Sequence, residues 1–181
     1  TVDGIRASKP GQAVSTAQVL AVTASAPNYV GRGAEKLIAA LDYFGFDPRD
    51  RVALDVGAST GGFTEVLLAR GAAKVYAVDV GHGQLHPSLS ADPRVVNREG
   101  ADARKIDASL VGDLVNAIVV DVSFISVLKT LPAVLTRVGP CAWLVVLIKP
   151  QFEAGRAAIG KGGIVRDEAV RQQCVATVSQ W

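Results

Sequence analysis

The spacing of apolar positions changes near residue 50, and this change predicts the architecture. Upstream, Leu37, Leu41 and Phe44 recur at helical spacing, which predicts an amphipathic helix over residues 34–44 that ends at Gly45. Downstream, short continuous apolar runs alternate with helical patterns, as is typical of strands buried on both faces of a parallel sheet. We therefore expect an α/β fold of the Rossmann type, with a mostly parallel sheet and helices on both faces.

The expected elements are bounded by glycine, proline and polar turn signals. Strands are expected at residues 52–56, 74–80, 95–97, 117–122 and 143–149. Helices are expected at residues 62–70, 127–137 and 167–180, with helical turns at 108–114. Residues 1–26 show only turns and short β-rich runs such as 19–22, which predicts short strands without a helix.

The segment RVALDVGASTGGFTEVLLARGAAKVYAVDVG has the strand–glycine loop–helix–strand order of a nucleotide-binding α/β domain. It is not the dinucleotide fingerprint, because Ser59 stands where GxGxxG has its second glycine, and Gly57 and Gly62 are five residues apart. Asp55 would also repel a pyrophosphate. An acid just before the loop suits a cationic ligand, so S-adenosylmethionine (SAM) is favoured over a nicotinamide cofactor.

Further acids follow the other expected strands. Asp79 lies 24 residues after Asp55, a separation that suits an acid on ribose hydroxyls. Asp102 could reach the adenine amino group, and a helix cap or a solvated loop acid is an equally good interpretation. The expected SAM-binding residues are Asp55, Gly57, Ala58, Ser59, Thr60, Gly61, Gly62, Phe63, Asp79, Val80, Asp102 and Asp121.

Asp121 and Lys149 form a second constellation at the ends of two expected strands, in VVDVSF and LIKPQF. Neighbouring strands lie about 4.8 Å apart, so the two charges should meet beside the cofactor methyl group. A lysine at a strand end is also commonly a solvated terminus. The residues after Asp121 lack the Pro-Pro-aromatic run of base-amine methylation. Neither cysteine is placed as a nucleophile for carbon methylation, so a hydroxyl acceptor remains.

Composition adds few constraints. The 19 basic and 17 acidic residues give a net charge of +2, which neither establishes nor excludes binding to nucleic acid. The isolated Cys141 and Cys174 argue against a disulfide framework or a zinc site and for a reducing compartment, which predicts the cytoplasm and no metal. The longest apolar run, residues 141–148, is too short to cross a bilayer. The lack of methionine and the start at Thr1 predict a portion of a longer protein.

Together the segments YVGRGAEKL, VVDVSFIS, IKPQFEAG, GKGGIVRD and the glycine-loop run resemble the TlyA, or haemolysin A, family. Its members are FtsJ-like, SAM-dependent ribosomal RNA ribose 2′-O-methyltransferases, typically acting on cytidine. The resemblance implies the end of an S4 RNA-binding domain at residues 1–24 and a linker at 25–30. It also implies a methyltransferase domain at 31–181 whose last strands are absent.

For the site, the resemblance implies a Lys-Asp-Lys-Glu tetrad in which Lys36, Asp121 and Lys149 supply the first three members. The glutamate would fall in a later motif that this sequence lacks. Lys149 is expected to act as the general base, provided that burial and the neighbouring Lys36 favour its neutral form. RNA phosphates are expected at basic residues that, taken singly, are more often solvated surface charges: Arg32, Lys36, Lys149, Arg156, Lys161 and Arg166.

Three alternatives stay open. The first is a non-catalytic SAM- or RNA-binding module associated with ribosomes. The second is the pore-forming activity that the family's older name suggests, which the lack of a basic amphipathic helix disfavours. The third is a nicotinamide oxidoreductase, which the glycine spacing disfavours. The sequence selects no nucleotide, no ribosomal subunit and no oligomeric state.

Overall fold

A five-stranded parallel sheet forms the centre of the structure, a computed structural model that describes residues 1–9, 11–21 and 29–181. The strands are β1 (Val52–Val56), β2 (Lys74–Asp79), β3 (Val95–Glu99), β4 (Val115–Val120) and β5 (Val138–Val146). Their order is β3-β2-β1-β4-β5, and every neighbouring pair is parallel. The chain changes direction across the sheet between β1 and β4, and a crevice for a ligand is expected at the carboxyl ends of these strands. The predicted α/β fold is confirmed.

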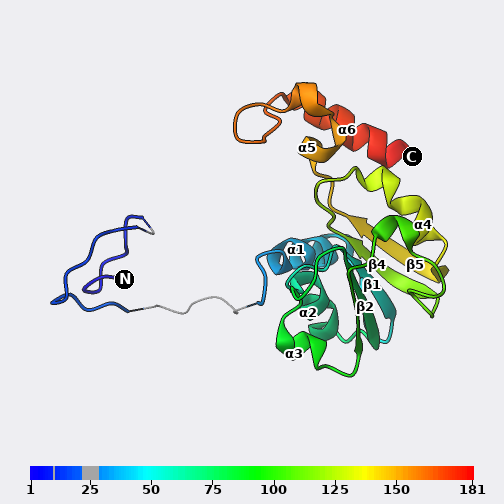
Figure 1. The fold of residues 1–181 in the computed structure, drawn as a ribbon, viewed down its shortest axis with the longest axis horizontal. Coiled ribbons are helices and arrows are strands. Elements are labelled where there is room, and N and C mark those ends of the chain that lie inside the picture. The colour runs from blue at the N-terminus through cyan, green and yellow to red at the C-terminus, as the bar shows by residue number, and fades with distance from the viewer. Residues whose placement is uncertain (10, 22–28) are drawn as a thin grey trace.

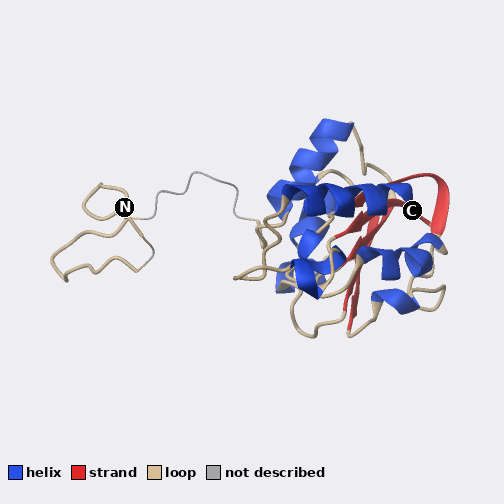
Figure 2. Cartoon of the chain, turned by 90° about the horizontal axis from the view of Figure 1, so that it is seen from above, coloured by secondary structure: helices blue, strands red, loops and turns tan. Residues whose placement is uncertain are grey.

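Helices cover both faces of the sheet, as the two ribbon views show (Figures 1 and 2). One layer contains α1 (Ala34–Phe44), α2 (Gly62–Ala69) and α3 (Pro87–Ser90). The other contains the three-ten helices η1 (Ala103–Lys105) and η2 (Val127–Lys129) and the helix α4 (Leu131–Leu135). Successive strand residues alternate between the two cores, so Ala53 packs with the first layer and Leu54 with the second.

After β5 the chain forms α5 (Pro150–Glu153), η3 (Arg156–Ala158) and α6 (Glu168–Gln180). Figure 1 shows these helices and the loop between them beyond the carboxyl end of β5. The first helix, α1, has the predicted bounds, because Leu37 and Leu41 are buried and Gly45 takes the left-handed conformation at φ 67°. The helix α6 begins one residue later than predicted, because Asp167 accepts hydrogen bonds from the N–H groups of residues 169 and 170 as its N-cap.

The largest error in the expected elements concerns β5, which runs over Val138–Val146 rather than residues 143–149. The strand begins before Gly139 and Pro140 and contains both, because β5 pairs only with β4 among the described strands. Proline is tolerated on an edge strand, and a register shift accompanies it. At the other end, Lys149 precedes Pro150, which opens α5 at its first position and therefore ends the extended segment.

Smaller differences have local causes. The helix predicted at residues 127–137 is divided into η2 and α4, because Pro132 cannot donate to the helical hydrogen-bond ladder. The helical turns predicted at 108–114 reduce to one turn closed by the Val111 N–H and the Asp107 carbonyl, 2.9 Å apart. The strands β3 and β4 are each shifted or extended by two residues.

Within residues 1–9 and 11–21 the structure contains isolated bridges rather than the short strands expected there. Val2 bridges both Ile5 and Leu20, and residues 1–9 and 11–21 contain no helix. The β-rich run 19–22, the proposed end of an S4 domain at residue 24 and most of the linker at 25–30 fall partly or wholly outside the described residues. Within the described chain, no helix combines the length and hydropathy needed to cross a bilayer.

Candidate active site

The glycine loop between β1 and α2 lies against the segment that follows β4. Gly57 adopts φ 87°, a conformation that favours glycine, and a Cβ atom there would lie 2.6 Å from the carbonyl oxygen of Asp121. The N–H of Gly57 donates to the Val78 carbonyl of β2 at 2.8 Å. The loop is therefore fixed between the ends of three strands, with α2 beginning at Gly62.

The segment before α1 packs on the same loop, backbone against backbone. A Cβ on Gly31 would lie 2.7 Å from Thr60 Oγ1, and one on Gly62 would lie 3.1 Å from the Gly31 carbonyl oxygen. Glu65 Oε2 accepts a hydrogen bond from the Val30 N–H at 2.7 Å. These contacts bring the basic residues of GRGAEK beside the loop. Sequence reasoning missed the tie made by Glu65, because it joins residues 35 positions apart.

Two adjoining cavities open at this edge of the sheet, and both are lined by Gly57, Ser59 and Asp121. The first, of about 490 Å³, is completed by residues from the segment before α1 and from the loop: Gly31, Arg32, Gly33, Lys36, Ala58, Thr60, Gly62 and Phe63. The second, of about 460 Å³, extends over β2 and the segments that follow β3 and β4, and includes Asp79, Val80, Asp102 and Phe124. Both volumes lie within the range of small-molecule sites.

Asp55 lies beneath the loop and is fully buried. Its Oδ2 accepts a hydrogen bond from Thr64 Oγ1 at 2.7 Å, whereas Oδ1 has no partner. Burial raises the pKa of Asp55 to about 7, against the lowering effect of the Thr64 hydrogen bond, and the charges of Asp121 and Asp79 add to the rise. A buried carboxylate oxygen without a donor is costly, and a cationic ligand nearby would relieve that cost.

Asp79 ends β2 and holds the rim of the second cavity. Its Oδ2 accepts from the Ser59 N–H at 2.8 Å, and its Oδ1 accepts from the Gly81 N–H at 2.7 Å. Each carboxylate oxygen can accept a further hydrogen bond, so a ribose hydroxyl can still be bound. The neighbouring Val80 is largely exposed, as a residue that contacts a ligand rather than the core would be.

Asp102 is a helix N-cap, which is one of the two alternatives to an adenine contact that its sequence position allowed. It caps η1 by accepting from the Arg104 N–H at 2.9 Å, and it forms an ion pair with the Arg104 guanidinium at 2.6 Å. The hydrogen bonds from Arg104 lower the pKa of Asp102 to about 2. The residue also lines the second cavity, so capping does not remove it from a ligand's reach, and its contact with adenine stays a prediction.

The expected meeting of Asp121 and Lys149 is found. Lys149 Nζ lies 2.5 Å from Asp121 Oδ1, and about four-fifths of each side chain is buried. The contact lacks hydrogen-bond geometry, so Oδ1 stays without a hydrogen-bond partner. Instead Nζ donates to Ser123 Oγ at 2.8 Å and to the Asp121 carbonyl at 3.4 Å. The sequence analysis did not name Ser123 as a site residue, although its position two residues after Asp121 could have indicated that it lies near Lys149.

The predicted RNA contacts divide into two groups. Arg32 and Lys36 are exposed and line the first cavity together with Asp121. The second group lies on the chain between α5 and α6 and consists of Arg156, Lys161 and Arg166. All three are exposed, and none of them lines either cavity. Phe63 borders the first cavity but is only 6 % exposed and belongs mainly to the core.

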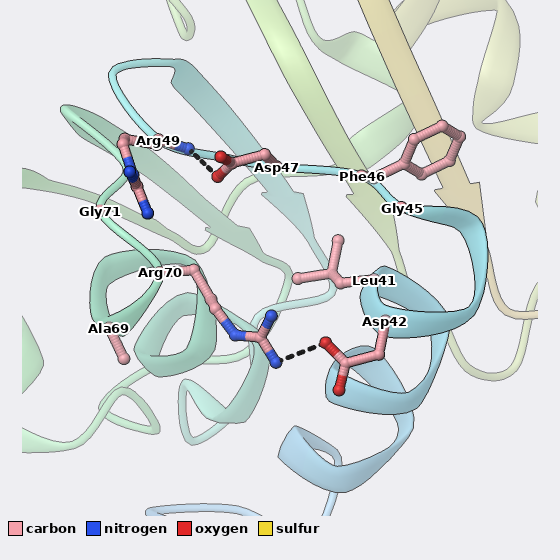
Figure 3. A pocket seen from close by; sticks show the side chains of 9 residues that line it. All are labelled: Leu41, Asp42, Gly45, Phe46, Asp47, Arg49, Ala69, Arg70 and Gly71. Atoms are coloured by element: carbon pink, nitrogen blue, oxygen red, sulfur yellow. Dashed lines mark hydrogen bonds and ion pairs between the residues drawn. The ribbon is translucent and has the colours of Figure 1, made fainter.

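A third cavity, of about 540 Å³, lies at the opposite, amino-terminal edge of β1 and β2 (Figure 3). Both of its carboxylates have partners: Asp42 pairs with the Arg70 guanidinium at 2.7 Å, and Asp47 accepts a hydrogen bond from the backbone N–H of Arg49. The buried polar atoms that lack partners, among the described residues, include none of its side chains. The candidate reactive groups therefore lie at the carboxyl ends of the strands and not at this third cavity.

Comparison with known proteins agrees with this geometry. The model of the FtsJ-like methyltransferase family matches residues 29–181. The chain is 48% identical over 180 residues to the 16S/23S rRNA (cytidine-2′-O)-methyltransferase TlyA of Mycobacterium tuberculosis, covering 99% of this chain and 67% of the relative. It is 47% identical over 146 residues to Hemolysin A of Brachyspira hyodysenteriae, covering 80% of this chain and 61% of the relative.

Among solved structures, a protein of Streptococcus thermophilus that carries the hemolysin name superposes with a TM-score of 0.82 at 42% identity. The match covers 87% of this chain and 57% of that one. The chain thus spans between half and about two thirds of the length of the relatives it matches.

Proposed function

Because this chain belongs to the FtsJ-like methyltransferase family, we propose that it transfers a methyl group from SAM to a ribose 2′-hydroxyl of ribosomal RNA. The observation that supports this most is the largely buried ion pair between Lys149 and Asp121, because Asp121 lines both cavities. The mycobacterial relative is named for cytidine, and we extend that nucleoside to this chain.

The second cavity is suited to the cofactor. It is bounded by Gly57, which admits no side chain, and by the carboxylates of Asp79 and Asp121. The unpartnered Oδ1 of Asp55 beneath the loop and the acidic rim of the cavity favour a cation, and SAM carries an ammonium and a sulfonium group. When bound, SAM supplies a methyl group already activated by its sulfonium. Asp79 would hold the ribose, and Asp102 would face the adenine.

The first cavity is suited to the acceptor nucleotide. Arg32 and Lys36 supply positive charge for the phosphates on either side of the ribose. Since Asp121 borders both cavities, a hydroxyl in one and a methyl group in the other would meet at its side chain. Holding the two reactants in line supplies a large share of the rate enhancement, about 7 kcal/mol or more in favourable cases.

The remaining task is to remove one proton. Methyl transfer forms the ether bond, breaks the carbon–sulfur bond and releases the hydroxyl proton. We assign Lys149 as the group that accepts that proton, because its amine lies 2.5 Å from Asp121, the residue that lines both cavities. Asp121 orients the Lys149 amine, and Ser123 fixes it from the other side.

The test is Lys149→Ala in the full-length protein, with Lys129→Ala, an exposed lysine on η2, as the matched control. Methylation of unmodified ribosomal subunits is mapped by mass spectrometry, and SAM binding is measured by calorimetry. Lys149→Ala should lower the rate by about 10²- to 10⁴-fold and leave SAM affinity nearly intact. Normal turnover by this variant would refute the assignment of Lys149. SAM binding by the wild type without any methylation would favour the non-catalytic module.

A further inference from the structure

The segments that carry Asp121 and Lys149 leave the sheet side by side. Their last backbone link is the hydrogen bond from the Leu147 N–H to the Val120 carbonyl, at 2.9 Å. Beyond it, residues 121–127 and 148–153 are all described, and no backbone hydrogen bond joins them. The distance between the two reactive side chains therefore depends on contacts made by side chains.

Two such contacts exist besides ring packing. One is the Lys149 ammonium on Asp121 and Ser123. The other is Glu153, the last residue of α5: its Oε2 accepts from Ser126 Oγ at 2.6 Å and its Oε1 accepts from the Val127 N–H at 2.8 Å. Both carboxylate oxygens of Glu153 thus bind the start of η2, with the added strength of a charged acceptor.

The two contacts lie one helical turn apart. Lys149 is the N-cap of α5 and Glu153 is four residues later, so both side chains point from the same face of the turn. The ring of Phe152 packs on that of Phe124, with centroids 5.3 Å apart, between these two anchors. The Lys149 contact must change when a proton moves, whereas the Glu153 contact need not.

We propose that Glu153 is a positioning residue that holds Lys149 at Asp121 while the proton is transferred; this role rests on the function proposed above. It acts through the backbone of the segment after β4 and touches neither cavity. The segment that it holds lines the second cavity through Asp121 and Phe124, so the removal of Glu153 should lower the rate of proton transfer more than it lowers SAM affinity.

The backbone of residues 121–127 has a conformation that needs support, which the contact with Glu153 provides. Phe124 takes φ 66°, which is unfavourable for a bulky side chain, and its ring is 92 % exposed, so packing alone does not hold it in place. The segment is anchored at one end by the Asp121 N–H on the Val56 carbonyl, at 2.9 Å. Glu153 supplies the anchor at the other end. Without it α5 can shift relative to this segment, and Lys149, the N-cap of α5, moves away from the carboxylate of Asp121.

A purely structural role, capping η2, is the competing explanation, and two substitutions separate them. Glu153→Ala removes both hydrogen bonds. Glu153→Gln keeps both, because its amide oxygen can accept from the Val127 N–H while its amide nitrogen donates to Ser126 Oγ. Glu168→Ala, which removes an exposed carboxylate at the start of α6, is the matched control.

The experiment uses the full-length protein with unmodified ribosomal subunits and saturating SAM, together with thermal melting and calorimetric SAM binding. Glu153→Ala should lower kcat by about 10- to 100-fold, the loss that a displacement of the order of 1 Å produces. Kd for SAM should rise by less than this factor, because Glu153 lines neither cavity. Glu153→Gln and Glu168→Ala should behave like the wild type.

A crystal structure of Glu153→Ala should show a Lys149–Asp121 distance longer than 2.5 Å. If Glu153→Ala does not fold, Ser126→Ala removes one of the two hydrogen bonds from the partner's side and should give a smaller loss in kcat. Unchanged kcat in Glu153→Ala overturns the positioning role alone. A loss of SAM affinity as large as the loss of kcat, or a glutamine variant no better than alanine, also overturns it. A wild type that binds SAM but methylates nothing overturns the proposed function itself.

Discussion

Replacing Asp55 with asparagine should stabilise the protein at neutral pH and leave its stability at acid pH unchanged. Asp55 is fully buried beneath the glycine loop, and its pKa is raised to about 7 from a value of 3.8 in the unfolded chain. The folded protein therefore holds a proton that the unfolded chain releases above pH 4. Stability is greatest below that pH and is lost as pH rises to about 7.

The size of this loss follows from the pKa difference. A difference of about three pH units, at about 1.4 kcal/mol each, corresponds to about 4 kcal/mol of unfolding free energy at pH 8. Asparagine does not ionise, and its carbonyl oxygen can still accept from Thr64 Oγ1. The variant should therefore become more stable than the wild type by a margin that grows from near zero at about pH 4 toward this value.

Urea unfolding followed by the fluorescence of the buried Trp143 measures this margin at intervals from pH 4 to pH 8. Asp107→Asn is the control: hydrogen bonds from Ser109 and Leu110 lower the pKa of Asp107, so its titration lies below this range. A margin for Asp55→Asn that is constant across the range would refute the reasoning. It would mean that Asp55 is ionised throughout. The same variant should bind SAM more weakly, because it lacks the buried negative charge.

Two further substitutions test the scaffold. Gly57→Ala places a Cβ 2.6 Å from the Asp121 carbonyl oxygen at φ 87°, so it should abolish calorimetric SAM binding and lower the melting temperature. Gly83→Ala, at φ 63° with nothing within 4 Å, should cost only about 1 kcal/mol of backbone strain, and equal effects of the two would contradict this account. Leu54→Ala, at a fully buried position of β1, should lower the unfolding free energy by about 2–5 kcal/mol in urea titrations; a loss below 1 kcal/mol would mean that the site collapses around the cavity.

Features with a local cause were predictable from the sequence. Continuous apolar runs located all five strands, and Gly45 ended α1 where expected, because each depends only on neighbouring residues. The cap at Asp102 has a similarly local cause, a contact two residues away. The ends of elements were less predictable near proline, which occurs both in turns and on edge strands. Pro140 lies inside the edge strand β5.

Contacts between distant segments were not predictable from spacing. Asp121 and Lys149 could be paired because the parallel sheet brings strand ends together. The bonds from Glu153 to Ser126, 27 residues away, and from Glu65 to Val30 depend on how loops leave the sheet. The spacing of apolar residues does not determine the course of these loops. Such side-chain-to-backbone ties decide how rigidly a site is held, and they became visible only in three dimensions.

The wall shared by the two cavities has a consequence for inhibition. Gly57, Ser59 and Asp121 line both spaces, so a single molecule could pass from one to the other at that wall. An adenosine analogue joined by a short tether to a nucleoside would occupy about 950 Å³ in all, and the second half would bind at the high effective concentration that the tether provides. A cationic atom in the tether, in the place of the sulfonium beside Asp121, would complete such a bisubstrate ligand.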